Sequence, residues 1–303
     1  MFEFDRGRRT LLGGLAAACA IGVVPPLPAR TPKHTLASEL EALEQRAGGR
    51  LGVYAFDAAT VRSAGWRANE RFALCSTFKL ALAAAVLEDA DREVLPLDTW
   101  ITYAQDDLVP HAPVTEKNLA MGGMTAGDLA RATQVTSDNV AANLLIRRLG
   151  GPEAVTRRLR AWGDPTTRLD RYEPDMNDVH GDDPRDTTTP EAIANTVARL
   201  FGGELLAKES RETLKRWTIE TQTGARRLRA GLPAEWSVGD KTGTAYADDR
   251  PTRVNDIAIV FRPDRAPLVV AAYYEGRTGG GVRPEDEAVL AEVGRSVAAW
   301  ASA

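Results

Sequence analysis

The order of expected strands and helices constrains the fold of this chain more than any other feature. Runs rich in β-branched and aromatic residues occur only near its two ends, at 50–57 and 62–66 and again at 236–244, 255–261 and 268–275. The middle of the chain has helical periodicity and helix-stop signals instead. Strands from both ends can pair in one sheet, with the helical middle inserted as a second domain. The crevice between two such parts is a natural place for a site.

Length and composition agree with two folded parts. The chain has 303 residues, of which 44% are hydrophobic and 26% charged, as in ordinary soluble proteins that bury a core. We expect an export signal at 1–29, a discontinuous α/β domain at 36–68 and 219–301, and a helical domain at 69–218.

Charge and metal-ligand content exclude some functions. The 38 basic and 42 acidic residues give a net charge of −4, so no overall positive field would attract nucleic acid. Three histidines make a histidine-rich metal site improbable, and two cysteines, Cys19 and Cys75, cannot form a disulfide scaffold. We therefore expect no nucleic acid as partner and no metal cofactor.

The N-terminus has the pattern of an export signal. Basic residues including Arg8-Arg9 precede an apolar stretch at 11–24, and a small-residue exit ends near Ala29. As a helix the stretch spans about 21 Å, which is short of the roughly 30 Å hydrocarbon core. The signal is either twin-arginine or general, and the mature protein is periplasmic or secreted. A lipid anchor at Cys19 is not expected, because the leucine usual three residues earlier is missing.

A serine and a lysine share one face at the start of a long apolar helix. In Ser76-Thr77-Phe78-Lys79 the amine can reach the hydroxyl, and backbone N–H groups at the helix start can stabilise an oxyanion. The Leu/Ala run 80–87 is apolar nearly all round and should be buried, which would desolvate Lys79 and ease its deprotonation. An N-cap serine with a solvent-facing lysine is the alternative.

Two further motifs follow along the chain. Ser137-Asp138-Asn139 lies between two helical stretches, where a helix cap is the simplest interpretation. Lys241-Thr242-Gly243-Thr244 ends a strand, and Lys241 and Thr242 can bind an anion while Gly243 lets a ligand approach the backbone. A common turn is the alternative for this motif.

The three motifs, in this order, resemble those of the serine penicillin-recognising enzymes. The segment 168–186 further resembles the omega loop of class A β-lactamases. The resemblance covers essentially the whole mature chain. It implies a β-lactamase/transpeptidase-like fold (α/β plus all-α), with an antiparallel five-stranded sheet flanked by helices and an inserted helical domain. It also implies a monomer that hydrolyses the β-lactam amide of penicillins and cephalosporins, which gives antibiotic resistance.

The family assigns catalytic roles to matching residues of this sequence. Ser76 would be the nucleophile, Lys79 would assist it, and Ser137 would relay a proton to the lactam nitrogen. Glu173 and Asn177 would position the hydrolytic water. Either Lys79 or Glu173 could be the acylation base.

Substrate-binding roles follow in the same way. Lys241, Thr242 and Thr244 would hold the substrate carboxylate, and Asn139 its side-chain amide. Backbone N–H groups of Ser76 and Thr244 would form the oxyanion hole. The resemblance also implies a cis Glu173–Pro174 bond and an Arg171–Asp186 ion pair that ties the loop ends.

Some positions depart from the family pattern. His111 stands where an aromatic residue often forms the site wall, and an exposed loop histidine is the alternative. Val254 replaces a carboxylate-binding arginine, for which Arg227 matches an alternative position; Arg250 or Arg253 could substitute.

Two departures bear on substrate range. The stretch 245–253 is longer than usual and is expected to be a loop that, with Thr244, is compatible with cephalosporins as substrates, without ranking them. Ala245 stands where carbapenem-hydrolysing relatives often have a cysteine, so Cys75 has no partner. This argues against strong carbapenem hydrolysis without excluding it.

Two other functions use some of the same residues. A cell-wall D,D-peptidase or penicillin-binding protein shares the first three motifs, and a β-lactam sensor needs acylation only. Glu173 favours the hydrolase, because only a hydrolase must activate water on the acyl-enzyme.

Overall fold

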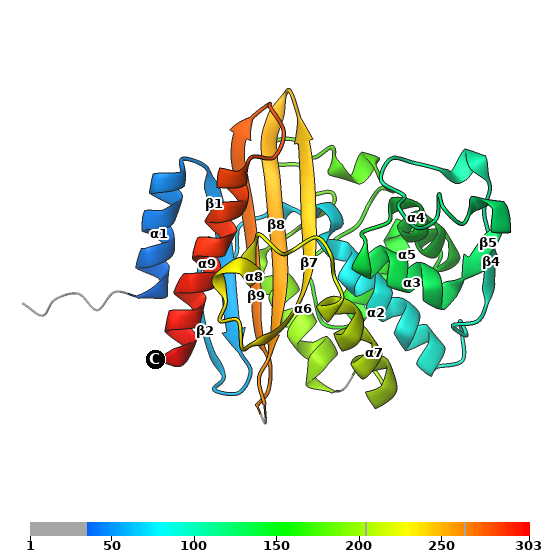
Figure 1. Ribbon diagram of the computed structural model, residues 1–303, viewed down its shortest axis with the longest axis horizontal. Helices are drawn as coiled ribbons and strands as arrows, with labels where there is room; N and C mark the ends of the chain where they lie inside the picture. Colours follow the sequence, from blue (N-terminus) through cyan, green and yellow to red (C-terminus); the bar gives the residue numbers. More distant parts are fainter. Residues whose placement is uncertain (1–34, 204, 264) are drawn as a thin grey trace, which may run out of the picture. The chain divides into compact units, whose positions relative to one another are not determined.

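The sheet is built from both ends of the chain. The computed structural model describes residues 35–203, 205–263 and 265–303. Within them, five antiparallel strands lie in the order β2-β1-β9-β8-β7, so that β7 is an edge strand (Figure 1). The strands are β1 (Arg50–Asp57), β2 (Arg62–Trp66), β7 (Ser237–Ala247), β8 (Arg250–Phe261) and β9 (Leu268–Thr278). The predicted origin of the sheet is confirmed, and β1 and β2 have the predicted bounds.

The prediction of a loop at 245–253 is wrong. Strand β7 continues to Ala247 and strand β8 begins at Arg250, so the turn between them consists of Asp248 and Asp249. The pairing shifts register between Ala245 and Ala247, which indicates a bulge. This end of the hairpin is polar and lacks the apolar alternation by which strands are recognised, so its sequence resembles a loop.

Helices cover both faces of the sheet. On one face, α1 (Leu36–Ala47), α8 (Leu228–Gly231) and α9 (Pro284–Ser302) pack in one apolar cluster (Figure 1). The opposite face packs against α6 (Pro190–Gly202) and α7 (Lys208–Ile219). Neither α7 nor two small two-stranded sheets were predicted from the sequence. One sheet pairs β3 (Phe72–Ala73) with β6 (Thr187–Thr188), and the other pairs β4 (Trp100–Thr102) with β5 (Gly123–Thr125).

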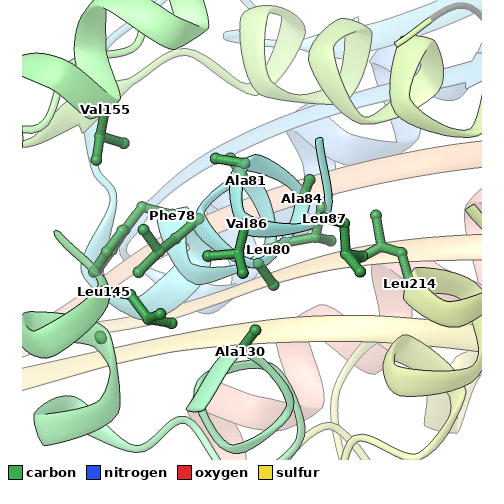
Figure 2. Packing of buried hydrophobic residues seen from close by; sticks show 14 of the residues in the cluster. Phe78, Leu80, Ala81, Ala84, Val86, Leu87, Ala130, Leu145, Val155 and Leu214 are labelled. Carbon is green, nitrogen blue, oxygen red and sulfur yellow. The ribbon is translucent and has the colours of Figure 1, made fainter. Parts of the chain in front are cut away.

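The helix that carries Lys79 is enclosed by its neighbours. Helix α2 (Phe78–Asp91) is buried along nearly its whole length, as its apolar sequence predicted. Figure 2 shows Ala130, Leu145, Val155 and Leu214 directed toward it from four other helices, which are α3 (Ala126–Val135), α4 (Asn139–Arg148), α5 (Pro152–Ala161) and α7. This packing fixes the position of the first turn of α2.

Local signals placed the helix ends well. Thr125 caps α3 by accepting from the backbone N–H of Asp128, and Pro152 and Pro190 are the first residues of α5 and α6. The predicted export signal and Cys19 lie outside the described residues. In the part of the chain that is described, no helix is long and apolar enough to span a bilayer.

Candidate active site

Ser76 and Lys79 lie together at the start of α2. A short 3-10 turn, Cys75–Thr77, leads into the helix, and Cys75 adopts a left-handed φ of 45°. Such a conformation is uncommon for a non-glycine residue and marks a locally constrained backbone. Lys79 Nζ is 3.0 Å from Ser76 Oγ, so the amine reaches the hydroxyl as the spacing predicted.

The Lys79 ammonium is buried among polar partners. Its Nζ donates to Ser137 O at 2.9 Å and to Asn139 Oδ1, and lies 3.0 Å from Glu173 Oε1. Burial lowers the pKa of Lys79 below its ordinary value, although the Glu173 carboxylate acts in the opposite direction. The predicted desolvation of this amine is confirmed.

The Ser137-Asp138-Asn139 motif combines a cap with two site residues. Asp138 caps α4 by accepting from the Ala141 N–H at 2.9 Å, so the structural interpretation holds for this residue. Ser137 has a φ of 61°, and its hydroxyl accepts from Lys241 Nζ at 3.0 Å. Lys79 Nζ is 3.4 Å from the same oxygen, so Ser137 lies between two buried amines.

The edge strand β7 carries the Lys-Thr-Gly motif beside the 3-10 turn. A Cβ atom on Gly243 would lie 2.9 Å from Leu74 O and 3.1 Å from Cys75 Cβ, so only glycine allows this approach without displacement. Lys241 is buried, and its pKa is well below its ordinary value because of that burial and the nearby charge of Lys79.

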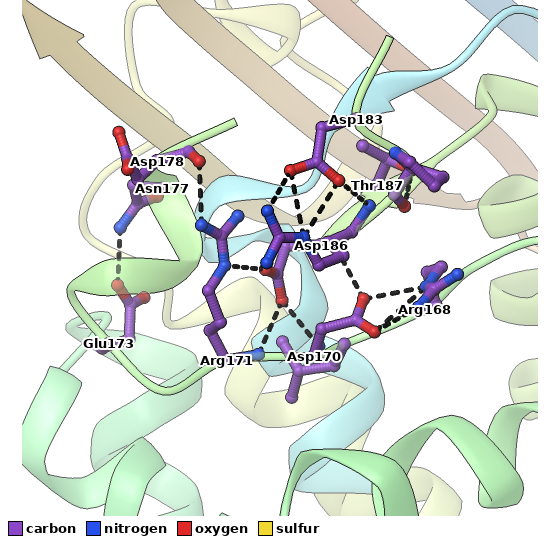
Figure 3. A network of polar contacts seen from close by, with 12 residues as sticks. Arg168, Asp170, Arg171, Glu173, Asn177, Asp178, Asp183, Asp186 and Thr187 are labelled. Atoms are coloured by element: carbon purple, nitrogen blue, oxygen red, sulfur yellow. Dashed lines mark hydrogen bonds and ion pairs between the residues drawn. The ribbon is translucent and has the colours of Figure 1, made fainter. Parts of the chain in front are cut away.

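The omega loop is held in place by a polar network. Arg171 Nε donates to Asp186 Oδ2 at 2.6 Å, and Asp186 Oδ1 accepts the Asp170 and Arg171 N–H groups (Figure 3). The predicted ion pair and the cis Glu173–Pro174 bond are therefore both confirmed.

Glu173 is fixed from two sides. Its Oε2 accepts from Asn177 Nδ2 at 2.7 Å (Figure 3), and its Oε1 is 3.3 Å from Ser76 Oγ. Asn143, on α4, donates to Glu173 O at 2.8 Å and accepts from Glu173 N at 2.9 Å. Sequence reasoning missed Asn143, although its place four residues after Asn139 puts both on one helix face.

These residues surround one cavity of about 580 Å³. The predicted site residues at its wall are Ser76, His111, Ser137, Asn139, Glu173, Asn177, Arg227, Thr242 and Thr244. Lys79 and Lys241 are buried beside it. The cavity also has wall residues not predicted from the sequence, namely Gln222, Thr223, Ala225, Arg226, Tyr246 and Glu287.

Of the three candidate carboxylate-binding arginines, Arg227 alone lines this cavity. Its Nη2 donates to Thr244 Oγ1 at 2.7 Å, and Glu287 lies beside its Nε at 3.3 Å. Arg250 and Arg253 bind the omega loop instead.

His111 is exposed, whereas Cys75 is buried. His111 lies at the cavity wall with its Nε2 3.0 Å from Thr136 O. Cys75 is a free, buried cysteine that packs near Ala245.

Comparison with known proteins agrees with this geometry. Residues 35–301 match the model of the "Beta-lactamase enzyme family". β-Lactamase L2 of Stenotrophomonas maltophilia is 45% identical over 301 residues, which cover 95% of this chain and 97% of that protein. The carbapenem-hydrolysing β-lactamase KPC of Klebsiella oxytoca is 43% identical over 240 residues, with 79% and 80% of the two chains covered.

Solved structures give the same result. A double mutant of the last common ancestor of Gram-negative bacteria β-lactamase class A has a TM-score of 0.84 and 48% identity, covering 89% of this chain and 100% of that one. A β-lactamase from Burkholderia vietnamiensis has a TM-score of 0.83 and 46% identity, covering 90% and 98%. The chain belongs to the class A β-lactamase family. Membership confirms the predicted fold class, including the five-stranded sheet, and identifies the enzyme as a β-lactam hydrolase.

Proposed function

We propose that the protein hydrolyses the amide bond of penicillins and cephalosporins through an acyl-enzyme on Ser76. The observation that carries this proposal is the 3.3 Å distance between Ser76 Oγ and Glu173 Oε1. It puts a fixed carboxylate within reach of any water that attacks an ester at Ser76.

In acylation, Ser76 Oγ attacks the lactam carbonyl carbon and the C–N bond breaks. The serine proton goes to Glu173 or to Lys79 in its neutral amine form, which burial favours; Lys79 Nζ is 3.0 Å from the hydroxyl oxygen and Glu173 Oε1 is 3.3 Å from it. Ser137 gives its proton to the departing nitrogen and takes one proton back from Lys79. If Glu173 received the serine proton, it passes that proton to Lys79, 3.0 Å away, and is again a carboxylate.

In deacylation, Glu173 takes a proton from water, and the water oxygen attacks the ester carbon. Ser76 Oγ leaves and takes that proton from Glu173, so the serine hydroxyl and the carboxylate are both restored. Asn177 orients the carboxylate through its 2.7 Å hydrogen bond. Its Oδ1 is buried and no group among the described residues donates to it, so it can accept from the same water.

The substrate is held mainly through its carboxylate and carbonyl. Lys241, Thr242, Thr244 and Arg227 bind the carboxylate, and backbone N–H groups of Ser76 and Thr244 bind the oxyanion. Asn139 binds the side-chain amide and steadies Lys79. His111 contributes the flat wall of the cavity.

The decisive experiment follows the burst and the steady state with a chromogenic cephalosporin. Sustained turnover is expected, whereas a stoichiometric burst alone would indicate a binding protein or sensor. Release of D-alanine from D-Ala-D-Ala would favour the peptidase. The Glu173→Ala variant should form the acyl-enzyme with penicillin and retain it, as mass spectrometry would detect; full turnover by this variant would refute the assignment.

We also propose that the enzyme is a monomer that is exported to the periplasm or medium and works without a metal. In the described part of the chain, no group of three or more His, Cys, Asp and Glu residues could hold a metal ion. EDTA should therefore leave the steady-state rate unchanged. We further propose that residues 36–68 and 219–301 form the discontinuous α/β domain and that residues 69–218 form the helical domain.

A further inference from the structure

We propose that Arg253 is a positioning residue for deacylation. In this role it holds the omega-loop segment 177–179 so that Asn177 keeps the Glu173 carboxylate against the Ser76 ester. The inference rests on the proposed function. It gives Arg253, a residue of β8, a role in deacylation, whereas the sequence had suggested that this residue could bind the substrate carboxylate.

The guanidinium of Arg253 binds two backbone carbonyls of the loop. Its Nη1 donates to Asn177 O at 3.1 Å and its Nη2 donates to Val179 O at 2.5 Å. Arg253 is only 5% exposed, so water competes little for these bonds. Asn177 ends a 3-10 turn, Asp175–Asn177, whose last carbonyls lack partners within the turn. Arg253 supplies the donor for the Asn177 carbonyl.

A second arginine of the same strand binds the residue between these two. Arg250 Nη1 donates to Asp178 Oδ1, and lowers the pKa of that carboxyl. In a regular strand Arg250 and Arg253 would point to opposite faces, because they are an odd number of positions apart. The register of β8 against β9 shifts between Pro251 and Arg253, and such a bulge redirects side chains. Both arginines therefore reach segment 177–179.

A short series of bonds connects Arg253 with the reacting atoms. Arg253 holds the backbone of Asn177, whose side chain donates to Glu173 Oε2 at 2.7 Å. The other oxygen of Glu173 is 3.3 Å from Ser76 Oγ. A displacement of Asn177 would move the carboxylate that activates water, but leave the Lys79–Ser76 contact in place.

Other contacts hold this part of the loop as well, since Arg171 Nη1 donates to Asp178 O at 2.9 Å and Val179 packs with Ala73 and Cys75. A cavity of about 610 Å³ lies between the second half of the loop and the sheet, lined by residues that include Val179, Asp183, Arg253 and Glu275. Because a cavity offers no dispersion contacts, the bonds from Arg253 supply support on the side of the segment that faces this cavity. Glu275 Oε1 lies 3.5 Å from Arg253 Nε and keeps the guanidinium oriented.

The test separates acylation from deacylation in the Arg253→Ala variant. With a penicillin whose deacylation limits the rate, kcat should fall by at least about tenfold and KM should fall with it, so that kcat/KM, which reports acylation, falls much less than kcat. The acyl-enzyme should accumulate in quenched mass spectra. Arg253→Lys keeps the charge but cannot donate to both carbonyls, so we expect a smaller loss of deacylation rate than in Arg253→Ala. This variant also keeps the test possible if Arg253→Ala does not fold.

Matched variants distinguish positioning from general damage. Arg277→Ala removes an exposed arginine from neighbouring β9 and should leave both steps unchanged. In the cycle of Arg253→Ala with Asn177→Ala, the effects on deacylation should be far from additive. An unchanged deacylation rate, or acylation and deacylation lowered equally, would overturn the inference. Absence of turnover in the unmodified enzyme would instead refute the proposed function.

Discussion

The Arg227 side chain is fixed between two strands and also reaches the substrate cavity. Its Nη1 donates to Gly243 O at 2.9 Å and to Asn255 O at 2.8 Å, and these bonds tie it to β7 and β8. Its Nη2 reaches the cavity beside Thr244. A cation fixed in this way can bind a carboxylate without losing much side-chain entropy.

We expect Arg227→Ala to lower kcat/KM for carboxylate-bearing β-lactams roughly 10- to 100-fold, because a hydrogen bond to a charged group contributes about 1.5–3 kcal/mol. Steady-state kinetics with a penicillin and a cephalosporin would measure the loss. Thermal unfolding of the same variant shows whether packing has also suffered. An unchanged catalytic efficiency would disprove this role.

Residues inside one motif were predictable, and residues that act across elements were not. Ser76, Lys79, Ser137 and Lys241 stand in short patterns whose chemistry is local. The contacts of Arg253 with Asn177 and Val179 exist only because two strands continue beyond the expected sheet and β8 changes register. No sequence spacing encodes such a contact.

At the scale of elements, β7 and β8 carry two buried carboxyl groups behind the site. Asp240 lies 2.8 Å from Arg229 Nη2, and Asp256 accepts from the Leu228 N–H. Burial raises the pKa of Asp240 to about 6. Burial, together with the charge of Asp240, raises the pKa of Asp256 well above its ordinary value.

This shift predicts how stability depends on pH. Between about pH 4 and 6 the folded state retains a proton on Asp240 that the unfolded chain has released, so its contribution to the free energy of unfolding falls as pH rises. Asp240→Asn mimics the protonated group. Its stability relative to the unmodified protein should therefore increase from pH 4.5 to pH 7.5 in urea unfolding, and a constant difference would contradict the shifted pKa.

For strands and helices, the sequence was most informative where burial imposes a pattern. The apolar run of α2 and the alternating strand β1 were predicted because α2 is buried on all sides and β1 buries mainly one face. The end of the β7–β8 hairpin, at 245–253, was not predicted because it is polar. Helix α7 was not predicted because it contains few apolar residues.

In the whole molecule, the helical part and the sheet share apolar packing. One cluster runs from α2 through its neighbouring helices to Ile257, Val269 and Tyr273 of the sheet, and a second cluster lies on the other face. The sheet depends on both chain ends, because β1 pairs with β9 from Arg50↔Glu275 to Asp57↔Leu268.

We expect a chain that ends at residue 262 to lose the fold altogether. It lacks β9 and α9, so β1 has no partner on its inner side and one core face is uncovered. This loss exceeds the roughly 5–15 kcal/mol by which domains are stable. Circular dichroism should show no cooperative thermal transition and the acylation burst should vanish, whereas a chain starting at residue 30 should retain both. A cooperative transition in the shortened chain would contradict the prediction.

The pairing of β1 with β9 also sets the timing of folding. During translation, β1 is made before residues 58–267, and β9, its second neighbour in the sheet, is made only after them. Contacts that join distant parts of a chain form slowly, because a long loop must close first. A nascent polypeptide therefore cannot complete this sheet, and antibiotic hydrolysis begins only after the ribosome has released the last strand.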